Sequence, residues 1–212
     1  MKAIVAGATG LVGTELVKKL LEDKSFSEVV IYSRKSPAIE DARLKVIKGE
    51  LSEINAHREE LKGDVYFCCL GTTIKSAGSQ ENFRKVDFHS IVSFGRLAFT
   101  HKASKFLVVS ASGAHSQSKI FYSRVKGETE KALKDIGFLS LFIYRPGLLV
   151  GNREESRTTE KIAVESYRIL RHILPEKITK SVATEVSGIV NRMIADAKTP
   201  ATGLQIIESK DI

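Results

Sequence analysis

Near its N-terminus the chain reads KAIVAGATGLVG over residues 2–13. The apolar run that opens this stretch predicts a short buried strand, and the amphipathic pattern of residues 11–22 predicts a helix directly after it. Between the two, each glycine has a physical task. Gly7 permits a tight turn, Gly10 lets the backbone approach a pyrophosphate, and Gly13 lets helix and strand pack closely. Backbone N–H groups and the positive end of the helix would then receive the anion.

This glycine turn has the spacing G-x-x-G-x-x-G, a variant of the dinucleotide-binding pattern G-x-G-x-x-G. Three glycines alone are weak evidence, since a merely structural turn can carry them. A strand before the turn and a helix after it are the context that the binding motif requires. The sequence therefore predicts a dinucleotide site, with contacts from Gly7, Thr9, Gly10, Leu11, Val12 and Gly13.

The rest of the chain alternates apolar segments with amphipathic ones. Further strands are predicted at residues 28–32, 44–48, 64–69, 105–110, 139–145 and 204–207, and further helices at 80–101, 119–136, 158–173 and 183–197. Continuous apolar strands between helices are typical of a parallel sheet covered on both faces. We therefore expect an α/β fold with a doubly wound parallel sheet of Rossmann type. The 212 residues suit a single domain, in which residues 151–212 would contribute a small substrate-side cap.

The formal net charge of +8 raises the question of a nucleic-acid partner. The basic residues are interspersed with acidic ones, however, as over residues 124–135, and this is typical of solvated helix faces. A basic protein also suits an anionic small ligand such as a phosphorylated cofactor. No apolar segment approaches the length of a membrane span. We therefore expect a small-molecule substrate and neither a nucleic-acid nor a membrane partner.

The two cysteines, Cys68 and Cys69, are neighbours within a predicted strand, so their side chains should point to opposite faces without forming a disulfide. Two small, buried, reduced side chains are the favoured interpretation. The histidines show no metal-ligand spacing, and no metal site is predicted. The apolar run at the N-terminus is too short for a signal peptide. The cytoplasm is therefore the expected compartment.

The type of dinucleotide is indicated by the residues that end the second strand, Ile31-Tyr32-Ser33-Arg34-Lys35. NAD-preferring sites place a carboxylate here for the ribose hydroxyls, whereas a 2′-phosphate calls for arginine. This chain offers a hydroxyl and two cations instead of a carboxylate. A basic surface loop is the alternative interpretation. The pattern favours NADP(H) as the cofactor, with Ser33, Arg34 and Lys35 at its 2′-phosphate.

Tyr122 and Lys126 form a Tyr-x-x-x-Lys pair on a predicted helix, so their side chains share one face. A nearby cation favours the phenolate and would lower the pKa of the tyrosine, which could then exchange a proton with a substrate oxygen. A serine hydroxyl at the end of the preceding strand, from Ser110 or Ser112, could hold the same oxygen. An ordinary helix face is the alternative, because Tyr-x-x-x-Lys is common. The order of glycine turn, strands, serine and tyrosine favours a catalytic site.

In this order of motifs the chain resembles the short-chain dehydrogenase/reductase superfamily, in particular its small atypical members. The segments FYSRVKGETE (121–130) and YRPGLLVGNREESR (144–157) are similar to the family of the HIV Tat-interacting oxidoreductases and their bacterial relatives. The glycine turn is generic to the whole superfamily, whereas the second segment is specific to a much narrower group of proteins within it. The resemblance extends over nearly the whole chain.

The resemblance implies roles for several residues. Tyr122 would be the proton donor, and Lys126 would bind the nicotinamide ribose and lower the pKa of the tyrosine. The cofactor would be lined by Leu70, Gly71, Thr72, Thr73, Pro146 and Gly147. Extended members of the superfamily match best at Ser112 and the Tat-interacting relatives at Ser110, and Ser112 is preferred here.

The chain departs from the extended members, which devote a larger C-terminal lobe to their substrate. The pocket is therefore expected to be small, open, or completed by the second subunit of a homodimer. The expected function is NADPH-dependent reduction of a small carbonyl or quinone-like molecule. The alternative is a non-enzymatic NADP(H) sensor or protein-binding regulator on the same fold. Tyr122 and Lys126 favour the enzyme, because a sensor needs no proton donor.

Overall fold

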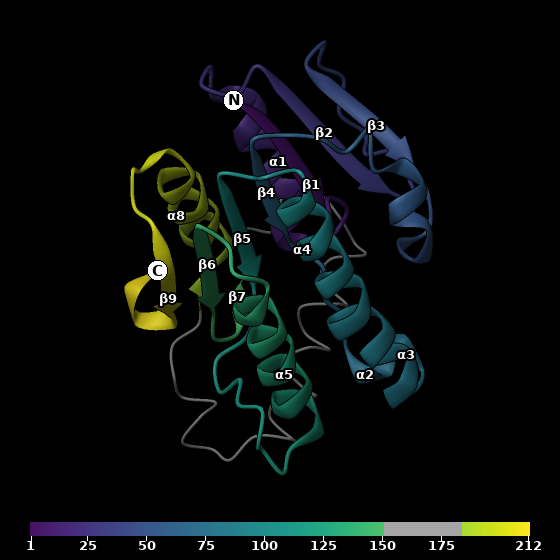
Figure 1. Ribbon diagram of the computed structural model, residues 1–212, viewed down its shortest axis with the longest axis vertical. Coiled ribbons are helices and arrows are strands. Elements are labelled where there is room, and N and C mark those ends of the chain that lie inside the picture. The colour runs from purple at the N-terminus through teal and green to yellow at the C-terminus, as the bar shows by residue number, and fades with distance from the viewer. Residues whose placement is uncertain (151–183) are drawn as a thin grey trace.

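The computed structural model describes residues 1–150 and 184–212. Its centre is a seven-stranded parallel sheet in the order β3-β2-β1-β4-β5-β6-β9 (Figure 1). The strands are β1 (Lys2–Ala6), β2 (Glu28–Ser33), β3 (Leu44–Lys48), β4 (Val65–Cys68), β5 (Lys105–Val109), β6 (Ser140–Arg145) and β9 (Gly203–Glu208). The chain winds from β1 toward β3 and then, from β4 on, toward β9, which confirms the doubly wound sheet. Ligands of such sheets bind at the carboxyl ends of the strands where the order reverses, here between β1 and β4.

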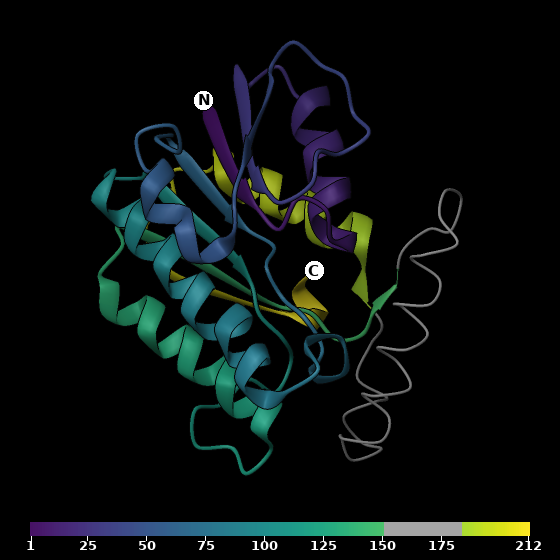
Figure 2. The ribbon, with the colours of Figure 1, turned by 90° about the vertical axis from the view of Figure 1, so that its right-hand side faces the viewer.

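Helices cover both faces of the sheet. They are α1 (Leu11–Glu22), α2 (Ile74–Ala77), α3 (Gln80–Arg84), α4 (Ile91–Thr100), α5 (Phe121–Ile136) and α8 (Val186–Lys198). Figure 2 shows the sheet between α1 and α8 on one side and α4 and α5 on the other. Each side has its own core, and β1 contributes to both: Val5 packs toward α1 and α8, and Ile4 toward α4. Neighbouring strand residues point to opposite faces, so both faces of each central strand must be apolar.

The cysteines follow the same alternation. Cys68 belongs to the core under α4 and α5, and Cys69 packs against the core under α1 and α8. Both are free, as predicted. Burial raises the pKa of the Cys68 thiol to about 12. Such a thiol stays protonated and behaves as a small apolar side chain.

The predicted helix at residues 80–101 is interrupted. It consists of α3, a π-helical turn over Lys85–Ser90, and α4. A π turn carries one residue more than an α turn and is frequent at functional sites, but a helical apolar pattern does not reveal it. The turn places Asp87 fully inside the protein, with no exposed surface.

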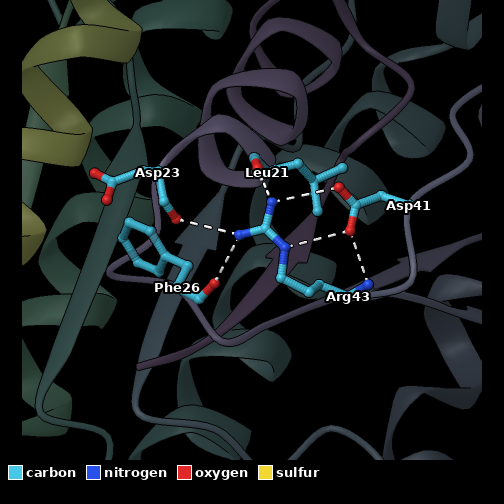
Figure 3. A network of polar contacts seen from close by, with 5 residues as sticks. All are labelled: Leu21, Asp23, Phe26, Asp41 and Arg43. Atoms are coloured by element: carbon cyan, nitrogen blue, oxygen red, sulfur yellow. Dashed lines mark hydrogen bonds and ion pairs between the residues drawn. The ribbon is translucent and has the colours of Figure 1, made fainter.

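The connection from β2 to β3 contains no helix and runs as a loop over residues 34–43. Arg43 fixes the end of this loop (Figure 3). Its guanidinium donates to the carbonyl oxygens of Leu21, Asp23 and Phe26 and pairs with the carboxylate of Asp41. Since these carbonyls lie at and just beyond the end of α1, Arg43 satisfies acceptors that the helix itself leaves open. The loop that begins at Arg34 is thereby anchored to α1.

Residues 184–212 belong to the sheet layer. β9 pairs with β6, and α8 lies beside α1. Lys105 of β5 fastens the end of α8, because its buried ammonium donates to the carbonyl oxygens of Asp196, Ala197 and Thr199. The described part of the expected substrate-side cap therefore extends the sheet by β9 and adds α8 to the helices that cover it. The rest of that range, with the predicted helix at 158–173 and the polar run at 153–159, lies outside the described residues.

Short elements complete the described chain. They are 3-10 helices at Leu51–His57 and Ser209–Asp211, and a two-residue pairing of β7 (Leu149–Val150) with β8 (Thr184–Glu185). Within residues 1–150 and 184–212, no helix has both the length and the apolar character to cross a membrane.

Candidate cofactor and active site

A cavity of about 990 Å³ opens at the carboxyl ends of β1, β4 and β5, and the glycine turn forms one wall of it. The turn places Gly7 at a φ of +83°, a conformation that favours glycine. A side chain at Gly7 would also meet the backbone of Cys69 at 2.5 Å, and one at Gly13 would overlap the carbonyl oxygen of Gly7. These two glycines are therefore required by the packing of β1, β4 and α1.

Gly10 is different. It has ordinary extended backbone angles (φ −83°, ψ 172°), and an added Cβ would meet only the Gly7 carbonyl oxygen, at 3.4 Å. The absent side chain is not needed for packing and leaves room in the cleft. Gly10 is also the N-terminal cap of α1, and no side chain satisfies the first N–H groups of that helix. The N-terminus of α1 therefore offers free N–H groups, a positive helix end and open space, and these together fit the pyrophosphate of a dinucleotide.

The far end of the cleft is lined by the segment that follows β2. Ser33 and Arg34 both lie on it, whereas Lys35 lies outside the lining. The Arg34 side chain is exposed and forms no ion pair within the described part of the chain. A guanidinium that is free at this position can bind the 2′-phosphate of a cofactor without breaking an existing contact.

One wall of the cleft was not predicted from the sequence, and it is built by the chain after β3. Gly49, Glu50, Leu51 and Asn55 line the cleft there. The Tyr32 hydroxyl donates to the Glu50 carbonyl oxygen at 2.6 Å and so joins this wall to β2. Its position in the sequence could have indicated this wall, because the segments that follow parallel strands all lie at the carboxyl edge of the sheet, where the ligand binds.

At the other end of the cleft, Tyr122 and Lys126 project from the first turns of α5. The Lys126 ammonium is buried and lies 2.7 Å from Oδ1 of Asp87. The second carboxylate oxygen of Asp87 accepts the backbone N–H of Thr72 at 2.9 Å. Thr72 belongs to the loop after β4, whose residues 70–73 line the cleft. Asp87 was not predicted, and it connects this loop to the lysine.

The ionisation of Tyr122 differs from the expectation. Burial raises the pKa of the tyrosine, Lys126 acts to lower it, and Asp87 acts to raise it, with a net upward shift. Burial also acts to lower the pKa of Lys126, but the Asp87 carboxylate outweighs this effect and the lysine stays charged. Lys126 thus acts on the tyrosine in the expected direction, but burial and Asp87 outweigh it, so the pKa of Tyr122 lies above its ordinary value and not below it. Burial dominates, and Asp87 offsets part of the lysine charge.

The structure separates the two candidate serines. Ser110 lines the cleft and donates its hydroxyl to Oε1 of the buried Glu130 at 2.6 Å. Glu130 is in turn paired with Arg145 at 2.6 Å. Ser112, the preferred candidate, lies outside the cleft lining, and its backbone N–H donates to the Pro146 carbonyl oxygen at 2.8 Å.

Most of the predicted site residues meet in this one cleft. Those that line it are Gly7, Thr9, Gly10, Leu11, Val12, Ser33, Arg34, Leu70, Gly71, Thr72, Thr73, Ser110, Tyr122, Lys126, Pro146 and Gly147. Those outside the lining are Gly13, Lys35 and Ser112. Within the described residues, no cluster of side chains suitable for a metal ion occurs.

A doubly wound parallel sheet with a glycine turn and a cleft at its switch point defines a dinucleotide-binding protein of the Rossmann class. Residues 7–172 match the family described as NAD(P)H-binding, and the chain belongs to this family. It is 30% identical over 213 residues to Protein HTATIP2 of Rattus norvegicus, covering 98% of this chain and 86% of that protein. It is also 34% identical over 160 residues to Protein FMP52-1, mitochondrial, of Scheffersomyces stipitis, covering 74% and 71%.

Solved structures support the same fold. MoeE5 in complex with UDP-glucose and NAD superposes with a TM-score of 0.74 at 17% identity, covering 98% of this chain and 75% of that one. Uronate dehydrogenase from Agrobacterium tumefaciens superposes with a TM-score of 0.70 at 14% identity, covering 98% and 76%. These likenesses show that the chain shares its fold with these proteins.

Proposed function

We propose that this protein is an NADPH-dependent oxidoreductase of the atypical short-chain dehydrogenase type, reducing a small carbonyl or quinone-like substrate. The observation that carries the proposal is that Tyr122 and Lys126, one helical turn apart on α5, line the same cleft as the glycine turn. Reduction of a carbonyl needs a proton donor beside the site of hydride transfer. A protein that only senses its cofactor needs no such donor.

The chain's own residues fit a bound NADP(H). The N-terminus of α1 would hold the pyrophosphate, and Ser33 and Arg34 would hold the 2′-phosphate. Lys126 would reach the nicotinamide ribose, with Pro146 and Gly147 bordering the ring. The preference for NADP(H) over NAD(H) is supported by the exposed Arg34 at the end of β2 and by the lack of a carboxylate within Ser33–Lys35.

When bound, NADPH supplies a hydride. The Tyr122 hydroxyl would give its proton to the substrate oxygen, so that a carbonyl would become an alcohol, and the resulting phenolate would be reprotonated from solvent. The raised pKa of Tyr122 keeps the hydroxyl protonated at neutral pH and supports the reductive direction. Lys126 stabilises the phenolate that forms.

The expected partners and compartment stay predictions. We propose a small-molecule substrate and no nucleic-acid or membrane partner, and the pocket is proposed to be small, open, or completed by the second subunit of a homodimer. The free thiols of Cys68, which is buried, and Cys69, which is half-buried, support a reducing compartment such as the cytoplasm. The fungal FMP52 relatives are named as mitochondrial proteins, and this name applies to those proteins.

The test is NADPH oxidation by the purified chain against a panel of aldehydes, ketones and quinones, with NADPH fluorescence measured separately for binding. We expect NADPH to bind and at least one class of substrate to be reduced in a way that depends on Tyr122. Binding without turnover across the panel would favour the NADP(H) sensor or protein-binding regulator instead.

A further inference from the structure

The π-helical turn Lys85–Ser90 has a feature that the proposed function does not explain. This turn places the carboxylate of Asp87, which has no exposed surface, beside the ammonium of Lys126, which is itself only 5% exposed. Burying two charges is costly, and an apolar pair of similar volume is often at least as stable. Stability alone is therefore a weak reason for this pair to be present.

Three contacts fix Asp87 from different directions. One carboxylate oxygen lies 2.7 Å from Nζ of Lys126, and the other accepts the N–H of Thr72 at 2.9 Å. The backbone is held as well, because the Thr129 hydroxyl lies 2.7 Å from the Asp87 carbonyl oxygen. Asp87 thus joins α5 to the loop that lines the cleft after β4.

The ion pair lies directly beside the expected cofactor surface. A Cβ added at Gly71 would stand 3.6 Å from both Oδ1 of Asp87 and Nζ of Lys126. The space above Gly71 is therefore where a ligand in the cleft would meet the lysine. Any displacement of the ammonium would change its distance from this ligand and from Tyr122.

Resting on the proposed function, we propose that Asp87 is a positioning residue, which holds the Lys126 ammonium over the cofactor loop and balances its charge beside Tyr122. Asp87 touches neither substrate nor cofactor in this arrangement and acts only through the lysine. Its effect is to keep Tyr122 a protonated donor while the lysine stays charged for the cofactor.

The groups that face this pair come from three elements. The Lys126 ammonium faces Asp87 from the π turn, Tyr122 from α5 and the thiol of Cys68 from β4. Lys85 and His89 of the π turn line the same cleft. Ser110, which directly follows β5, donates its hydroxyl to Glu130. Of these, Asp87 is the one carboxylate whose influence reaches both Lys126 and Tyr122 in the described structure.

The test is the variant Asp87→Asn, which keeps the shape and an acceptor for Thr72 but removes the charge. The near-ultraviolet absorbance of tyrosinate is titrated with and without Tyr122→Phe, and the difference isolates Tyr122. Because the unbalanced ammonium favours the phenolate, we expect the midpoint of Tyr122 ionisation to fall by about one pH unit or more. In the reductive assay, loss of activity at high pH should move down by the same amount.

The matched control is Asp135→Asn, which removes an exposed aspartate paired with Lys131 at 2.9 Å on the same helix. It should leave the Tyr122 midpoint and NADPH affinity unchanged. An unchanged midpoint in folded Asp87→Asn, verified by circular dichroism, would overturn the proposal, because a merely structural aspartate would change only stability.

Should Asp87→Asn fail to fold, the double variant Asp87→Asn with Lys126→Met removes both charges and should fold. Its Tyr122 midpoint should lie within about half a unit of wild type or above it, and a fall of about one unit or more would contradict charge balance. NADPH binding by the wild type is measured in parallel. If the wild type did not bind NADPH, the proposed function would be ruled out, but the tyrosinate titration would still test the role of Asp87.

Discussion

Ser110 gives its hydroxyl hydrogen to Glu130, with 2.6 Å between Oγ and Oε1, and the two residues are buried. The hydroxyl has one proton, so while this bond exists it cannot donate to a substrate oxygen. Arg145 forms an ion pair with Glu130 at 2.6 Å, and a hydrogen bond to a charged partner is stronger than one between neutral groups. The serine expected to hold the substrate thus takes part in a structural network.

Ser110→Ala is accordingly expected to lower turnover by less than about tenfold, well below the usual contribution of a general acid. Ser112→Ala should have a similarly small effect, since Ser112 lies outside the cleft lining. Steady-state kinetics on both variants would check this. A loss of a hundredfold or more in Ser110→Ala alone would mean that its hydroxyl leaves Glu130 for the substrate.

Tyr122→Phe should keep NADPH affinity near wild type and lower turnover by about a hundredfold or more, because it removes the proposed proton donor alone. Lys126→Ala should lower both, since the lysine serves the ribose and the tyrosine. Fluorescence titration and single-turnover kinetics separate the two effects. Wild-type turnover in Tyr122→Phe across the neutral pH range would instead indicate hydride transfer without a protein acid.

Arg34→Ala should abolish a preference for NADP(H) that we expect to be at least tenfold in the wild type, about 1.4 kcal/mol. The guanidinium is exposed at the end of β2 and available for a phosphate. Lys35→Ala is the matched control, because this neighbouring cation lies outside the cleft lining. Both cofactors are titrated against all three proteins, and equal affinities in the wild type would end the NADP assignment.

Gly10→Val should prevent cofactor binding and leave the protein folded. The backbone angles of Gly10 are open to any residue, and the new side chain would point into the cleft rather than into the core. Gly13→Val should instead fail to fold, since its Cβ would overlap the Gly7 carbonyl oxygen. Circular dichroism and NADPH fluorescence distinguish these results. Retained binding in Gly10→Val would make the turn purely structural.

Asp23 at the end of α1 pairs with Lys198 at the end of α8, at 2.8 Å. Hydrogen bonds from Lys198 and Ser25 lower the pKa of this carboxyl to about 2. A pKa that is lower in the folded state contributes stability above the ordinary value of 3.8, and this contribution is lost as the pH falls from about 4 to about 2.

Asp23→Asn should therefore be less stable than wild type at neutral pH and should show a smaller loss of melting temperature over that acidic range. Lys198→Met should reproduce most of the effect, because the lysine is the largest cause of the shift. Thermal melts at a series of pH values provide the measurement. Parallel curves for wild type and Asp23→Asn would show that the pair has no net effect.

Much of the fold follows from local sequence patterns. β1 and α1 occupy residues 2–6 and 11–22 as predicted, and α5 ends at Gly137 in the left-handed conformation. A buried parallel strand must be apolar on both faces, and an amphipathic helix repeats with its own period, so a few consecutive residues are enough to identify either. The glycine turn was readable for the same reason, since its demands on Gly7 and Gly13 arise within one strand–turn–helix unit.

What the sequence alone determined is therefore the class of fold, the dinucleotide cleft and the pairing of Tyr122 with Lys126 on one helix face. Only the tertiary structure decided that Asp87 meets Lys126, because residues far apart in the chain meet through a π turn that has no apolar signature. It also decided between Ser110 and Ser112, which occupy neighbouring positions at a strand end but have different partners. The tertiary structure also determined the pKa of Tyr122. This pKa depends on burial and on the opposite charges of Lys126 and Asp87, which come together only in the folded protein.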